Sequence, residues 1–215
     1  MRAENRQSRG RPKNERRAYM NSAPHSQLTA PRRLIVGISG ASGIIYGITA
    51  LRMLRELGVE THLVVSKSAI VTLNHESELK FTDLYALADV HYQNTDIGAA
   101  IASGSFRTMG MLVAPCSIRS LSEISTGVTS SLLSRAADVV LKERRRLVLM
   151  VRETPLHAGH LQSMLNVTNS GAVVMPPVPS FYTKPQTLQD MVEQTVGRAL
   201  DLFGLEVDIK RWGES

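Results

Sequence analysis

Residues 33–48 read RLIVGISGASGIIYGI, a short apolar run followed by a glycine-rich turn and the start of an amphipathic segment. The apolar run has the length and branched side chains of a buried strand. After the turn, Ile44, Ile48, Leu51 and Leu54 recur at helical spacing, and Gly58 supplies a residue suited to a helix end. A buried strand that turns directly into a helix is the building unit of a parallel α/β sheet.

The same alternation continues along the chain. Four further runs have the character of buried strands: THLVVS (61–66), MLVAP (111–115), LVLMV (147–151) and AVVMP (172–176). Segments 129–145, 157–169 and 186–203 have helical patterns between and after them. We therefore predict an α/β fold, a doubly wound parallel sheet in a single domain. Ligands of such sheets bind beyond the carboxyl ends of the strands, at residues 39–43, 66–68, 115–120, 152–155 and 176–182.

Charge and composition exclude several other classes. The net charge is +6, but residues 1–30 contain seven basic and two acidic residues, so the remainder is nearly neutral and no nucleic-acid footprint is expected on it. Residues 1–30 lack apolar periodicity and are expected to be a disordered basic tail, with the domain at 31–215. No apolar run is long enough to cross a membrane. Cys116 is the single cysteine, which excludes an internal disulfide and fits a cytoplasmic protein.

The turn GISGASG (37–43) predicts a phosphate site, because glycines let the backbone approach a ligand and the following helix N-terminus favours an anion. Its spacing departs from the dinucleotide fingerprint, and Ser66 stands where a ribose-binding acid would end the second strand. The hydroxyls of Ser39 and Ser42 fit the phosphate of a mononucleotide such as FMN better than NAD. A simple tight βα turn is the alternative.

Other strand ends contain polar groups. The stretch APCSIRS (114–120) offers serine hydroxyls after a proline that is expected to end the strand, and Cys116 is expected to be inert because no histidine adjoins it. Arg152 and Glu153 follow the fourth run and are candidates to bind an anion and to move a proton. Arg135, Asp138 and Lys142 share one helical face, for which a solvated surface is the alternative.

The ordered set of motifs resembles the UbiX family of flavin prenyltransferases, over residues 32 to 215. The matching strings are SGASG-x-I-Y-G, VVSK, SGSF, APCS, RAADVVLKERR, VRETPLH, GAVVMPPVPSFY and the terminal RWG. The resemblance implies a Rossmann-like or flavodoxin-like subunit of a homo-oligomer, typically a dodecamer, with sites at subunit junctions. It implies transfer of a dimethylallyl group from dimethylallyl phosphate to reduced FMN without a metal. The prenylated FMN would serve a UbiD-type decarboxylase, in ubiquinone synthesis or on aromatic acids.

The resemblance also implies roles for individual residues. Flavin contacts would fall on Gly40, Ala41, Ser42, Ser66, Ser117, Ile118, Arg119, Ser120 and Arg152. The prenyl phosphate would be held by Lys142, Tyr182 and Arg198, with Trp212 covering the prenyl group. Glu153 would move protons, with Lys142 and Ser42 also catalytic. Lysine, arginine and phenol groups are suitable donors for the developing charge of a phosphate leaving group.

Two sequence features depart from this family, and two other functions remain open. Arg146 stands where the family often has proline, and residues 1–30 match nothing in it. A flavin-dependent cysteine decarboxylase would need an asparagine-bearing segment where APCSIRS stands, and a catalytic histidine. A non-catalytic FMN-binding flavoprotein would give Lys142, Arg152, Glu153, Tyr182 and Arg198 no reason to converge.

Overall fold

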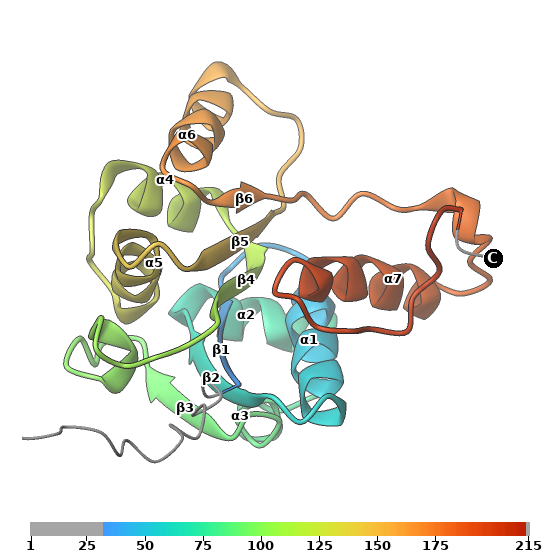
Figure 1. Ribbon diagram of the computed structural model, residues 1–215, viewed down its shortest axis with the longest axis horizontal. Coiled ribbons are helices and arrows are strands. Elements are labelled where there is room, and N and C mark those ends of the chain that lie inside the picture. The colour runs from blue at the N-terminus through green and yellow to red at the C-terminus, as the bar shows by residue number, and fades with distance from the viewer. Residues whose placement is uncertain (1–31, 214–215) are drawn as a thin grey trace, which may run out of the picture.

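A computed structural model describes residues 32–213 of the chain as a single sheet covered by helices on both faces (Figure 1). The expected disordered tail at 1–30 lies outside these residues. The elements are β1 (Arg33–Ile38), α1 (Ile44–Glu56), β2 (Glu60–Val65), α2 (Lys67–Glu76), α3 (Phe81–Tyr85), β3 (Val90–Gln93), η1 (Ala100–Ala102), β4 (Gly110–Cys116), α4 (Ile118–Thr126), α5 (Leu132–Lys142), β5 (Arg146–Val151), α6 (Ala158–Asn169), β6 (Val173–Val174), η2 (Phe181–Thr183) and α7 (Leu188–Asp201).

The described strands form one parallel sheet in the order β3-β2-β1-β4-β5-β6. This is the Rossmann order, and it confirms the predicted doubly wound single-domain fold. The strand order reverses direction between β1 and β4, and ligands of such sheets bind beyond the carboxyl ends of the strands at this point. The motifs after β1 and β4 flank this switch point.

Two apolar cores lie on the two faces of the sheet. One packs α1, α2, α3 and α7 against the sheet, and the other packs α4, α5 and α6. The central strands are buried on both sides, which explains their continuous apolar runs. Among residues 32–213, no helix is both long enough and apolar enough to cross a bilayer.

The proline in β4 does not end that strand as the sequence analysis expected. The strand continues through Pro115 to Cys116, with an irregularity in its pairing to β5 between Val113 and Cys116. The Ala114–Pro115 peptide bond is cis. A local bulge accommodates the residue that cannot donate to the ladder. The polar stretch after β4 therefore begins at Ser117.

Candidate functional site

Ser39 joins the ends of the two strands that flank the switch point. Its hydroxyl is fully buried, donates to the carbonyl oxygen of Pro115 at 2.9 Å and accepts from the amide of Ser117 at 2.7 Å. The hydroxyl proton and one lone pair are therefore used within the protein, and burial shields the other lone pair. Ser39 fixes the distance between the β1 and β4 ends and is not one of the phosphate-binding hydroxyls that the sequence analysis expected.

Glu76, the last residue of α2, caps the N-terminus of α1. Its Oε2 accepts from the amides of Gly43 at 2.8 Å and Ile44 at 3.0 Å, and its carboxylate also accepts from the Ser42 hydroxyl. Gly43 has φ +100°, a conformation that favours glycine, and its own residue type offers no capping side chain. The sequence analysis expected this helix start to favour the anion of a ligand, but at these two amides the anion is the carboxylate of Glu76.

Sequence reasoning missed Glu76, since it stands in an unremarkable helix 33 residues from the turn that it caps. Burial raises the pKa of its carboxyl, but the hydrogen bonds from Ser42, Gly43 and Ile44, together with the Arg152 guanidinium, outweigh burial and hold the pKa below the usual range. Burial raises the pKa of the Tyr46 hydroxyl, and the same Arg152 guanidinium partly offsets this rise. Arg152 thus lies near both the turn and α1, as its expected place at the strand end requires.

Two other helices begin at the same edge. Ser66 is the N-cap of α2 and accepts from the amide of Ala69 at 3.2 Å. Ser117 is the N-cap of α4, accepts from the amide of Ser120 at 3.3 Å and donates to the Ser120 hydroxyl. Helix N-termini with capping serines favour anions, because their amides and dipoles point out of the helix.

The glycine turn after β1 packs directly on the start of α2. A Cβ atom at Gly40 would lie 2.2 Å from the Cβ of Ser68 and 3.0 Å from its carbonyl carbon. Only glycine fits at this distance. The turn and the α2 N-terminus consequently form one continuous backbone surface, which suits a flat or phosphorylated ligand that approaches the main chain closely.

The stretch after β4 and β5 completes this edge. Ser120 is buried, Ile118 is partly buried, and Arg119 extends into solvent with an ion pair to Glu123 at 3.0 Å. Arg152 and Glu153 are both exposed immediately after β5, and Glu153 accepts from the amide of Thr154 at 2.9 Å. The edge therefore collects a set of the predicted residues: Gly40, Ala41, Ser42, Ser66, Ser117, Ile118, Ser120, Arg152 and Glu153.

Lys142 does not belong to this edge within one chain. It is the last residue of α5 and precedes β5, whereas Arg152 follows β5. Six strand residues separate the two positions, which corresponds to roughly 20 Å at ~3.3 Å per residue. Lys142 forms an ion pair with Glu143 at 2.5 Å beside the loop at Gly104.

Tyr182, Arg198 and Trp212 form a separate group on the C-terminal part of the chain. After β6 the chain runs out from the body of the molecule to η2, and α7 returns to pack on α1 (Figure 1). The rings of Tyr182 and Trp212 meet edge to face with centroids 5.4 Å apart. Arg198 lies on the last turn of α7. The predicted residues thus occupy three places in one chain, and a single subunit does not bring all of them together.

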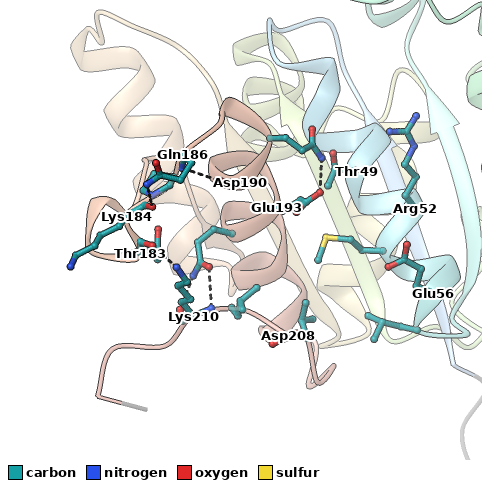
Figure 2. Close-up of a pocket in the computed structure, with 17 residues that line it drawn as sticks. Thr49, Arg52, Glu56, Thr183, Lys184, Gln186, Asp190, Glu193, Asp208 and Lys210 are labelled. Atoms are coloured by element: carbon teal, nitrogen blue, oxygen red, sulfur yellow. Dashed lines mark hydrogen bonds between the residues drawn. The ribbon is translucent and has the colours of Figure 1, made fainter. Parts of the chain in front are cut away.

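A cavity of about 700 Å³ lies between α1, α7 and the C-terminal segment (Figure 2). Its wall includes Arg52, Glu56, Glu193 and Lys210, and none of the predicted site residues. It is therefore distinct from the sheet edge. In the described part of the chain, no three His, Cys, Asp or Glu side chains are grouped to hold a metal ion.

Cys116 is fully buried, and burial raises the pKa of its thiol to about 12. The thiol is therefore protonated at any physiological pH, and a protonated thiol is a poor nucleophile. This geometry supports the interpretation of Cys116 as an inert core residue.

Comparison with known proteins places this geometry in a family. Residues 22–200 match the family model described as Flavoprotein. The Flavin prenyltransferase UbiX of Escherichia coli K12 is 57% identical over 175 residues, which cover 81% of this chain and 93% of the relative. A solved structure of AnUbiX (PadA1) in complex with FMN and dimethylallyl pyrophosphate is 50% identical, has a TM-score of 0.84 and covers 86% of this chain and 98% of its own. A dodecameric FMN-dependent UbiX-like decarboxylase from Escherichia coli O157:H7 is 48% identical, has a TM-score of 0.82 and covers 84% and 98%.

Proposed function

The chain belongs to the UbiX family of flavin prenyltransferases, and from this membership we propose that it transfers a dimethylallyl group from dimethylallyl phosphate to reduced FMN. In this reaction the allylic C–O bond breaks, inorganic phosphate leaves, and the flavin gains a fourth ring with loss of a proton. Prenylated FMN would then pass to a UbiD-type decarboxylase. The observation that carries the proposal is the sheet edge where the glycine turn, the α2 and α4 N-termini and Arg152–Glu153 lie together.

The donor set at this edge fits FMN. Ser66, Ser117 and Ser120 place hydroxyls at two helix N-termini, and we assign the flavin phosphate to these rather than to the α1 N-terminus, which Glu76 caps. Gly40–Ser42 would lie along the flavin ring system, since the turn permits close approach of the main chain. Bound there, FMN supplies the nucleophilic ring atoms of the reaction.

Glu153 and Ser42 are the residues we assign to proton transfer. Glu153 is an exposed carboxylate that follows Arg152 directly in the chain, and Ser42 is hydrogen-bonded to the carboxylate of Glu76. A positioned carboxylate typically contributes 10²–10⁴-fold to a rate-limiting proton transfer. Arg152 would hold negative charge next to these groups, and its guanidinium also lowers the pKa of the Glu76 carboxyl.

The prenyl phosphate would be bound by Lys142, Tyr182 and Arg198, with Trp212 over the prenyl group. Lys142 precedes β5 and Arg152 follows it, so the two residues lie at opposite ends of the strand. We therefore propose that each site is assembled from more than one subunit of a homo-oligomer, a dodecamer like its structural relative. We place the enzyme in the cytoplasm, which the single unpaired cysteine supports.

The test is incubation of the purified protein with anaerobically reduced FMN and dimethylallyl phosphate, followed by mass spectrometry of the released flavin. The expected product carries one additional prenyl unit, and an equal amount of inorganic phosphate is released. Dimethylallyl pyrophosphate in a parallel reaction identifies the preferred donor. Recovery of unmodified FMN with both donors would contradict the proposed function.

A further inference from the structure

The C-terminal segment 207–212 is fixed on α7 by side chains that sequence reasoning did not single out. The Gln194 side chain donates to the Lys210 carbonyl at 2.8 Å and accepts from the Lys210 amide at 3.2 Å. The Lys210 ammonium donates to the Thr183 carbonyl at 2.8 Å (Figure 2). One amide side chain thus pairs with both main-chain groups of one residue, as a neighbouring strand would. The segment has a defined position although its end is exposed.

Asp201 fixes the same segment closer to its end. The carboxylate accepts from both terminal nitrogens of Arg211, at 2.5 and 2.7 Å, and its side chain is only 9% exposed. A two-point arginine–carboxylate pair is among the stronger polar contacts in proteins and also sets the orientation of the guanidinium. The backbone of residue 211, and with it that of residue 212, is therefore tied to the last turn of α7.

The same carboxylate has a weaker contact with a predicted phosphate ligand. Arg198 places one terminal nitrogen 3.5 Å from the Oδ2 atom of Asp201, and its side chain is 57% exposed. The short contacts with Arg211 already use both oxygens of the Asp201 carboxylate. Arg198 is therefore kept near a fixed carboxylate while most of its guanidinium faces solvent, where it can bind an anion.

Trp212 depends on this arrangement for its position. Its side chain is 81% exposed, so burial in this subunit does not hold it. Its ring contacts Tyr182, whose hydroxyl lies 3.4 Å from the Lys210 carbonyl. The distance between α7 and the segment is also tight, because a Cβ at Gly197 would lie 2.3 Å from Ile209. Loss of the Asp201–Arg211 pair would remove two short contacts of Arg211, leave its 3.4 Å contact with the Val207 carbonyl, and loosen Trp212 against Tyr182, while Gln194 and Lys210 stay in place.

We propose that Asp201 is a positioning residue for the prenyl-phosphate half of the site. By holding Arg211 it places Trp212 against Tyr182, and by its second contact it sets the location of Arg198. Asp201 touches neither substrate nor flavin in this arrangement and acts through the two arginines. The inference rests on the proposed function, because it assigns Arg198, Tyr182 and Trp212 to one substrate.

The experiment compares Asp201→Asn with Glu193→Gln in the full-length protein. Both changes remove one carboxylate from α7, but Glu193 is exposed and bonds to Gln189 on its own helix. For Asp201→Asn we expect the KM for dimethylallyl phosphate to rise about tenfold or more and the midpoint of thermal unfolding to fall, because a largely buried ion pair is broken, while the Kd for FMN stays near wild type. Glu193→Gln is expected to match wild type in all three.

A second readout needs no turnover. Trp212 is the single tryptophan of the chain, so intrinsic fluorescence reports on it directly. In Asp201→Asn we expect lower anisotropy and stronger acrylamide quenching than in wild type or Glu193→Gln. Arg211→Lys keeps the charge but not the two-point contact, and is expected to give a smaller change in the same direction; it replaces Asp201→Asn if that variant does not fold.

The outcomes separate the two proposals. A wild-type protein that leaves FMN unprenylated contradicts the proposed function, whatever the fluorescence shows. A wild-type protein that prenylates FMN, with Asp201→Asn or its substitute Arg211→Lys unchanged in both KM and Trp212 fluorescence, contradicts the positioning role. A loss of FMN affinity in Asp201→Asn, in parallel with the lower thermal stability, contradicts it as well, because it would mark Asp201 as a general structural residue.

Discussion

At the scale of single residues, the carboxylates at the sheet edge have different surroundings and should respond differently to mutation. Within residues 32–213, Glu153 is exposed and accepts a hydrogen bond from the amide of the next residue, whereas Glu76 carries three hydrogen bonds from the turn that it caps. Removing the charge of Glu153 should therefore affect chemistry alone. Removing Glu76 should affect both the turn and the chemistry next to it.

We expect Glu153→Gln to bind FMN and dimethylallyl phosphate with wild-type affinity and to lose roughly 10²–10⁴-fold in the rate of product formation. The substitution keeps the shape of the side chain and removes the base. Single-turnover reactions with anaerobically reduced FMN, followed by mass and absorbance analysis, measure this rate. Glu123→Gln, which removes an acid paired with the exposed Arg119, is the control. A wild-type rate in Glu153→Gln would leave that residue with a structural role only.

Glu76 predicts a specific pH dependence of stability. Its pKa in the folded protein is below the ordinary value of 4.5, so the carboxylate stabilises the fold above that pH and this contribution is lost as pH falls through the folded pKa. Glu76→Gln keeps an acceptor oxygen but should remove this part of the pH dependence. Glu76→Ala also loses the helix cap, at a cost of about 1 kcal/mol. Urea unfolding from pH 7 down to about pH 2 measures both effects, and curves parallel to wild type in the Gln variant would refute the assignment.

At the scale of elements, the sequence analysis predicted the strands and helices with strong apolar patterns and missed the short elements. The five strands and four helices with strong apolar patterns are all present within a few residues of their expected bounds. β3 was not predicted, because it has only four residues with alternating burial at the sheet edge. The helices α2, α3 and α4 were also missed. These three are five to ten residues long, and each buries at most three side chains.

The candidate site was predicted as a list of residues but not as an arrangement. Residues that directly follow strands lie where the topology rule places them, which is why the turn, Ser66, Ser117 and Arg152 are at one edge. Lys142 stands at a helix end, to which that rule does not apply. Glu76 and Asp201 act through contacts with residues distant in sequence or in the next segment, and no local pattern marks such contacts.

The packing of the glycine turn on α2 leads to a prediction about Gly40. In Gly40→Ala the new methyl group would overlap the main chain and side chain of Ser68, so the α2 N-terminus must move. We expect at least tenfold weaker FMN binding and a loss of about 1–3 kcal/mol in stability, typical of overpacking. Gly98→Ala is the matched control, since the nearest atom to its new Cβ is 3.6 Å away on an exposed side chain. Fluorescence titration of FMN and denaturant unfolding decide the result; equal behaviour of the two variants would show that the turn can move freely.

At the scale of the whole molecule, Lys142 and Arg152, which we propose to share a site, lie at opposite ends of β5. A site that needs both must take them from different copies of the chain. Exposed apolar side chains on α6 and the C-terminal part, among them Leu161, Leu165 and Phe181, are available to such contacts. We therefore expect an oligomer at micromolar concentration by light scattering.

Mixing inactive subunits tests this arrangement. Lys142→Ala and Arg152→Ala should each abolish prenyl transfer when pure. Co-refolded or co-expressed together, they should recover activity at roughly a quarter of the junctions, where an intact Lys142 faces an intact Arg152. A mixture of Lys142→Ala with Lys142→Met, which lacks any intact lysine, is the control and should stay inactive. Absence of recovery in a mixed oligomer of confirmed composition would show that one chain supplies both residues.

The buried hydroxyl of Ser39 also has a consequence for the order of events during folding. It bonds to Pro115 and Ser117, which are 76 and 78 positions away in the chain. These bonds close a loop that contains β2 and β3, and contacts between residues so far apart in sequence are slow to form. We therefore expect the junction between the β1 and β4 ends to form late in folding. A chain that binds flavin at this edge should by then have paired these two central strands.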